Sequence, residues 1–252
     1  MTITSRLRPA AGLLMILAVL PLLGGCRTEG NSISIGQNSN SSSGSSGGGT
    51  TDGSSYTIDG SVAKISFSGR AGRVTVQAKA GAITVTERAR YTSSKPLTSH
   101  NVSGEVLQLK EEGCPNRPSN GPCQVDWEIT APAGTVLDLE TNAGNIDLRD
   151  VAGQVTVRCG AGDVTATGLT SRQVDTTSDI GGVELIFTEA PDDVTATADI
   201  GAVKITLPSG AAYAVRTSVS VGDRNVEVRQ DPASSHRITA KADVGEIEIT
   251  NG

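Results

Sequence analysis

Aliphatic and polar residues alternate along most of the chain between residues 137 and 249. In Val203-Lys204-Ile205-Thr206-Leu207, for example, every second side chain is aliphatic. This is the period of a β-strand that buries one face. No long stretch has the 3.6-residue period of an amphipathic helix. The pattern therefore predicts an all-β protein built from short strands.

The alternation is organised into six copies of one phrase, each centred on a glycine. An aliphatic residue stands seven positions before each glycine, and another stands two positions after it in every copy except the fifth, which has Arg224. Because glycine adopts positive φ without steric cost, each is predicted to form a corner between two strands. The stretch from Val74 to Val85 fits the same columns around Gly81. The predicted corners are Gly81, Gly144, Gly162, Gly181, Gly201, Gly222 and Gly245.

Three further columns precede the glycine. Directly before it stand apolar residues, namely Ala143, Ala161, Ile180, Ile200, Val221 and Val244. Two positions before it stand mostly Asx or Ser, namely Asn142, Gly160, Asp179, Asp199, Ser220 and Asp243. Such residues beside a bend usually bond to local backbone, so turn chemistry is favoured over calcium binding. Three positions before the glycine all residues are small or β-branched, and Cys159 in this column is predicted to be an inert interior side chain.

The glycine-to-glycine spacings are 18, 19, 20, 21 and 23 residues. Repeats of this length indicate a solenoid, in which each coil buries a face only by stacking on its neighbours. An antiparallel β-sandwich is the alternative, since it too uses short alternating strands. The repeated columns favour the solenoid. Since the last copy ends at Ile249, an uncovered final coil with open backbone groups is expected.

The first 26 residues are predicted to be a signal peptide. Arg6 and Arg8 precede an apolar run from Ala10 to Leu23, which is too short to span a bilayer. Leu23-Gly24-Gly25-Cys26 resembles the bacterial lipobox, which implies cleavage before Cys26 and its acylation. The alternative is ordinary secretion with a free Cys26. The expected location is the outer face of the bacterial cell membrane, with attachment through lipid.

Residues 27–55 are rich in Ser, Gly, Asn and Thr and are predicted to be a disordered tether. Without Arg6 and Arg8 the chain has 19 basic against 27 acidic residues, a balance of −8. A chain with this balance has no general attraction to nucleic acid or to anionic membranes. No nucleic-acid partner is therefore expected.

Residues 56–252 are predicted to form the repeat domain, interrupted at 88–132 by an irregular insertion. Cys114 and Cys123 bracket a loop rich in Pro, Asn and Gly, and in an exported chain this spacing favours a disulfide over a metal site. Trp127 alternates with aliphatic residues, so packing is favoured over ligand stacking.

The sequence carries no recognisable catalytic motif. Outside the Ser/Gly-rich residues 27–55 there is no Gly-x-Ser-x-Gly elbow, and the chain has no phosphate-binding Gly-x-x-x-x-Gly-Lys and no His-Glu-x-x-His. The chain has only two histidines, and the acidic residues are spread over outward strand positions. We predict a protein that is not an enzyme and needs no cofactor or metal, with a glycan hydrolase as the remaining catalytic alternative.

The phrases Ala-Gly-Asn-Ile, Ala-Gly-Asp-Val, Ile-Gly-Gly-Val, Ile-Gly-Ala-Val and Val-Gly-Glu-Ile, together with Leu207-Pro208-Ser209-Gly210, resemble a family of bacterial β-strand-repeat proteins. That family is known as a putative-adhesin domain of unknown function. The resemblance implies a right-handed β-solenoid, often on an exported or membrane-anchored protein, and supplies no catalytic residues.

The leading hypothesis is a lipid-anchored surface protein whose rigid solenoid binds an envelope polymer or another protein. The alternative is a regulatory or structural role in the envelope, in which the 88–132 insertion is presented to a membrane signalling partner.

Overall fold

The computed structural model describes residues 49–116 and 121–252. All regular elements in these residues are β-strands. The predicted signal peptide, Cys26 and the tether as far as residue 48 lie outside these residues. Strand β1 (Thr50–Ile58) pairs along its whole length with β4 (Ile83–Tyr91). Strand pairing thus already begins at Thr50, six residues before the predicted boundary at residue 56.

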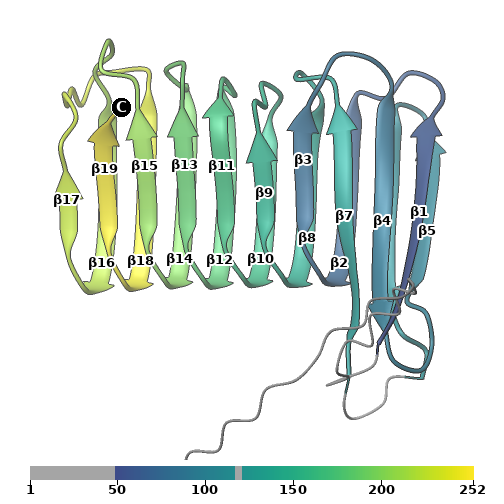
Figure 1. Ribbon diagram of the computed structural model, residues 1–252. Helices are drawn as coiled ribbons and strands as arrows, with labels where there is room; N and C mark the ends of the chain where they lie inside the picture. Colours follow the sequence, from purple (N-terminus) through teal and green to yellow (C-terminus); the bar gives the residue numbers. More distant parts are fainter. Residues whose placement is uncertain (1–48, 117–120) are drawn as a thin grey trace, which may run out of the picture. The chain divides into compact units, whose positions relative to one another are not determined.

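The strands form two sheets (Figure 1). The first sheet has the spatial order β1, β4, β7 (Cys123–Ala131), β3 (Val74–Ala78), β9 (Ile146–Arg149), β11 (Val164–Leu169), β13 (Val183–Phe187), β15 (Val203–Leu207), β19 (Ile247–Asn251) and β17 (Arg224–Val226). The second has the order β16 (Ala214–Val221), β18 (Arg237–Val244), β14 (Asp193–Ile200), β12 (Gln173–Ile180), β10 (Val155–Ala161), β8 (Val136–Ala143), β2 (Lys64–Ala71), β6 (Val106–Gly113) and β5 (Leu97–Ser103).

One strand from each sheet makes a coil, as in β10–β11 or β12–β13. Neighbouring coils pair in parallel and in register, so that Val155 lies beside Val174 and Val164 beside Val183. The inward side chains of both sheets are buried in one continuous hydrophobic core. The predicted all-β solenoid is confirmed, and the antiparallel sandwich is wrong because the repeat strands pair in parallel.

The glycines turn the chain from the second sheet into the first, along the lower edge of the strands in Figure 1. Gly181 illustrates the geometry: its φ is +140°, and a Cβ there would overlap the carbonyl oxygen of Gly162 in the preceding coil. Glycine is required by both its conformation and the close approach of the coils. The other predicted corner glycines that turn the chain in this way are Gly144, Gly162, Gly201, Gly222 and Gly245, all with positive φ.

Gly81 is not such a corner. It lies in the connection between β3 and β4, and a Cβ there would meet nothing within 4 Å. The corner of coil β2–β3 is Gly72, whose N–H donates to the carbonyl of Ala143 in the next coil. Ile65, seven residues before Gly72, and Val74, two residues after it, fit the columns of the repeat. The predicted corner at Gly81 is therefore wrong, and the corner of this copy lies one strand earlier, at Gly72.

The coils do not stack in chain order at either end. Coil β6–β7 packs outside β2–β3, although it comes later in the chain. At the opposite end, coil β18–β19 lies between β14–β15 and β16–β17. The expectation of an uncovered final coil is therefore wrong: β16–β17 is the end coil, and it covers the last coil of the described chain.

The other end of the solenoid is closed by antiparallel strands. Strands β4 and β1 extend the first sheet, and β5 extends the second. The ring of Tyr56 on β1 stacks on His100 of β5, with ring centroids 4.2 Å apart. Residues 88–132 supply β5, β6, β7 and the end of β4, so the predicted insertion is an integral part of the fold. Trp127 is 1% exposed, as its predicted packing role requires.

Candidate functional site

The described residues offer few groups that could carry out chemistry. No group of three or more His, Cys, Asp or Glu side chains there is placed to hold a metal ion. Cys159 is buried, its Sγ lies 3.3 Å from the carbonyl oxygen of Gly144, and burial raises the pKa of its thiol. A thiol with a raised pKa is a poor nucleophile at neutral pH. Its predicted interior role is confirmed.

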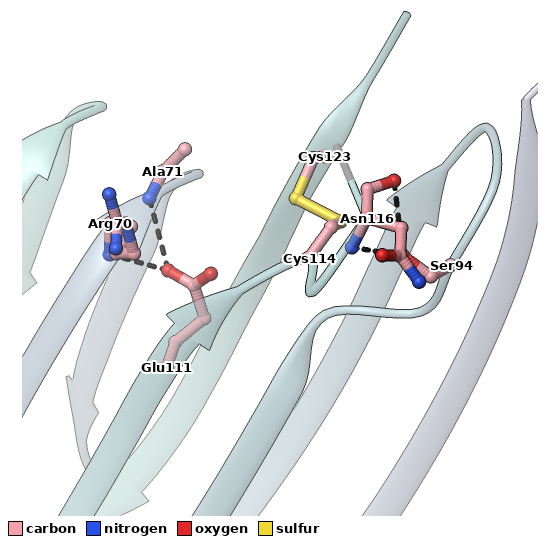
Figure 2. The surroundings of a disulfide bond; sticks show 7 residues. All are labelled: Arg70, Ala71, Ser94, Glu111, Cys114, Asn116 and Cys123. Atoms are coloured by element: carbon pink, nitrogen blue, oxygen red, sulfur yellow. Dashed lines mark hydrogen bonds between the residues drawn. A yellow bond between two sulfur atoms is a disulfide. The ribbon is translucent and has the colours of Figure 1, made fainter. Parts of the chain in front are cut away.

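The predicted disulfide between Cys114 and Cys123 is present and links the end of β6 to the start of β7 (Figure 2). Beside it, the carboxylate of Glu111 accepts the backbone N–H groups of Arg70 and Ala71, immediately before the Gly72 corner. Glu111 is only 3% exposed. This cluster therefore fastens coil β6–β7 to coil β2–β3, which is a structural task.

The most unusual surface feature is a row of aliphatic side chains at the corners of the last four coils in space. Ile180, Ile200, Val244 and Val221 are 57%, 54%, 49% and 63% exposed. They are neighbours in register, since Ile180 pairs with Ile200, Ile200 with Val244, and Val244 with Val221. We call these four residues the corner row. Each stands directly before its glycine.

The backbone of the corner row is fixed by hydrogen bonds between coils. The carbonyl of Ile180 accepts the N–H of Gly162, and that of Ile200 accepts the N–H of Gly181, at N···O distances of 2.8 and 2.9 Å. Gly201 and Gly245 donate in the same way to Val244 and Val221, at 3.0 and 2.9 Å. The four side chains are therefore presented on a rigid edge, and little backbone order has to be gained when they bind.

Carboxylates lie along both sides of the corner row in sequence. Asp179, Asp199 and Asp243 stand just before its members, and Asp223 and Glu246 stand just after two of the glycines. All five are exposed. None of these side chains forms a hydrogen bond or salt bridge with any part of the chain that the structure describes. They are free to attract a cationic partner.

This result corrects the prediction that the Asx residues two positions before the glycine bond to local backbone. That task is performed one position after the glycine in the upstream coils. Asn145 accepts the N–H of Asp163 at 3.1 Å, and Asp163 accepts the N–H of Gly182 at 2.8 Å. The aspartates of the later coils thus have no structural task in the described part of the molecule.

The corner row is confined to one part of the solenoid. Upstream, the same column holds Ala71, Ala143 and Ala161, which offer little apolar surface. The apolar column directly before the glycine is evident in the sequence, but its exposure is not. Its exposure follows from the corner itself, where the backbone leaves the second sheet before the first begins. A clue in the sequence is the change from Ala to Ile or Val in four copies, three of which have Asp directly before that residue.

The fold defines this chain as a β-solenoid of two-stranded coils with one antiparallel end. The family model described as Toastrack DUF4097 matches residues 27–250, and the chain belongs to this family. The predicted resemblance is thereby confirmed. The comparison with curated proteins found no match. Among the described residues, no helix is long and apolar enough to cross a membrane.

Solved structures that match this chain come from bacteria. A structure described as a putative cell adhesion protein from Clostridium sporogenes ATCC 15579 has a TM-score of 0.55 at 14% identity, over 81% of this chain and 100% of that chain. A putative adhesin from Bacteroides fragilis NCTC 9343 has a TM-score of 0.47 at 15% identity, over 81% and 97%. At 14% identity the likeness to the Clostridium sporogenes protein shows the fold alone.

Proposed function

We propose that this protein is a non-enzymatic binding protein of the bacterial cell surface, anchored to the outer face of the cell membrane through a lipid on Cys26. The observation that carries the proposal is the corner row, an exposed aliphatic edge on a rigid scaffold. Exposed apolar clusters on soluble folds typically mark interaction sites. The name of the Clostridium sporogenes protein, a putative cell adhesion protein, is consistent with this role.

The binding function is tested with the full-length chain and fractions of its own cells. We would measure its retention on purified cell-wall material and on detergent-solubilised membranes, with and without Ile180→Ser and Ile200→Ser together. Leu97 and Val102 are 52% and 40% exposed at the far end of the solenoid, so their double serine variant is the matched control. Losing two half-exposed aliphatic contacts should weaken binding about thirty-fold, at about 1 kcal/mol each.

Equal retention of both double variants would refute the corner row as the binding surface. If only wall material retains the protein, the partner is an envelope polymer and the adhesion hypothesis is supported. If the chain is retained only by a protein of the solubilised membranes, the regulatory role replaces the adhesion role. Deleting residues 88–132 would not distinguish the adhesion and regulatory roles, because the deletion would remove Trp127 and three strands of the core.

The anchor is tested separately with Cys26→Ala. The wild-type chain should fractionate with membranes, and its N-terminal peptide should carry the added mass of acyl chains. The variant should lack that mass and leave the membrane fraction. Identical masses and fractionation for the two proteins would refute the lipid anchor and favour ordinary secretion.

A further inference from the structure

We propose that the corner row receives a basic amphipathic helix of a partner protein, an inference that rests on the proposed binding function and specifies its ligand. The helix would lay an aliphatic stripe along Ile180, Ile200, Val244 and Val221. Its Lys and Arg side chains would flank that stripe and meet the acidic residues on either side.

The spacing of the corner row matches a helix better than an extended strand. Neighbouring strands in a sheet are about 4.8 Å apart, so the four side chains span about 14 Å. Residues on one stripe of a helix recur about once per 5.4 Å turn, and four of them span about 16 Å. In an extended strand, side chains on one face are about 6.8 Å apart and four span about 20 Å. Only the helix keeps all four contacts in phase.

The charges around the row select the same partner. Asp179, Asp199, Asp243, Asp223 and Glu246 are all exposed and unpaired within the described part of the chain. Two basic residues also lie near the row: Arg224, whose guanidinium donates to Thr217 at 3.1 Å, and the exposed Lys241, three positions before Val244, so the five carboxylates outnumber the bases. Carboxylates that precede and follow members of the apolar row along the chain favour a ligand with basic residues beside an apolar stripe. They repel anionic polymers and lipids, and they repel the same row on a second copy.

The rigidity of the row also favours a helix as its ligand. Each member of the row has its carbonyl bonded to the glycine of the adjacent coil, so the surface cannot close around a flexible chain. A flat, fixed edge gains contacts only from a partner that is itself regular. An amphipathic helix brings such a surface, with anchors that recur at i, i+3, i+4 and i+7.

The test uses a capped synthetic peptide of about 18 residues that forms about five helical turns. It carries leucines on one stripe and lysines on both sides of it. One control peptide has the same composition in scrambled order, and another has glutamate in place of every lysine. Binding to the full-length chain is measured by titration calorimetry at low and high salt.

We expect the lysine peptide to bind saturably and more weakly at high salt, whereas the scrambled and glutamate peptides do not bind. Ile180→Ser with Ile200→Ser should weaken binding about thirty-fold, and Leu97→Ser with Val102→Ser should leave it unchanged. Asp199→Asn with Asp243→Asn should weaken binding mainly at low salt, because it removes two of the flanking charges.

The inference is overturned if the two double serine variants bind the lysine peptide alike, or if the scrambled peptide binds as tightly as the ordered one. It is also overturned if the chain forms a dimer that the Ile180→Ser and Ile200→Ser variant abolishes, since the row would then serve a second copy. The retention assay separates the two proposals. If retention on cell fractions depends on the row but no helical peptide binds, the binding function stands and the helix is wrong.

Discussion

Replacement of a corner glycine by alanine tests the central structural argument, and Gly181→Ala is the most informative case. Its φ of +140° is unfavourable for any side chain, at about 1–2 kcal/mol. In addition, the new Cβ would overlap the carbonyl of Gly162 and push two coils apart. That displacement loosens the bond from Gly162 N–H to the carbonyl of Ile180, worth about 1 kcal/mol, and neighbouring core contacts, worth about 1 kcal/mol more. The expected loss is about 3–4 kcal/mol.

Two other glycines separate the contributions. Gly81 has φ +117° but open space around its Cβ position, so Gly81→Ala should cost only the conformational strain, about 1–2 kcal/mol. Gly210 has open space and no positive φ, so Gly210→Ala should be neutral or stabilise by about 0.5 kcal/mol. The free energy of unfolding would be measured by chemical denaturation with far-ultraviolet circular dichroism. If Gly181→Ala costs no more than Gly81→Ala, close approach of the coils does not require the glycine.

Three further predictions concern other parts of the fold. Cys159→Ser should change the free energy of unfolding by less than about 1 kcal/mol, because a hydroxyl can make the same hydrogen bond to the carbonyl of Gly144 in the preceding coil. A thiol reagent should modify Cys159 only after unfolding, and rapid labelling of the native chain would contradict its burial. Replacing Cys114 and Cys123 by serine should cost about 2–3 kcal/mol, measured by denaturation against the oxidised wild type, and an unchanged midpoint would show that the clamp is not needed. Burial and the hydrogen bond to Glu87 raise the pKa of Tyr56 above its usual value of about 10, so the stability contributed by the neutral phenol should be fully present below pH 10 and fall at higher pH. Tyr56→Phe should reduce this alkaline loss of stability in a pH series of denaturation curves. An equal loss in both proteins would refute the role of Tyr56.

The sequence by itself determined the class of fold and most of the corners. Alternation with period two specifies strands whatever their partners, and the six aligned glycines specify identical turns. The spacing of Cys114 and Cys123 and the interior place of Cys159 also followed from local pattern. These features could be read because each depends on residues that are close together in the chain.

Tertiary structure decided the order of the coils. Any coil with the same inward columns can stack on any other, so the sequence does not state which coil lies beside which. Coil β18–β19 inserts before β16–β17, and β6–β7 lies outside β2–β3. The same ambiguity moved the corner of the first copy from Gly81 to Gly72, because both glycines are followed by an aliphatic residue two positions later.

Tertiary structure also decided which apolar residues reach solvent. Ile180 and Ile200 belong to an aliphatic column that resembles the interior ones in sequence, yet they are more than half exposed. The reason is geometric: at a corner the chain leaves one sheet before it enters the other, and the strand alternation that points side chains inward stops there. Only the stacking of coils then brings Val244 and Val221 beside them to make a continuous row.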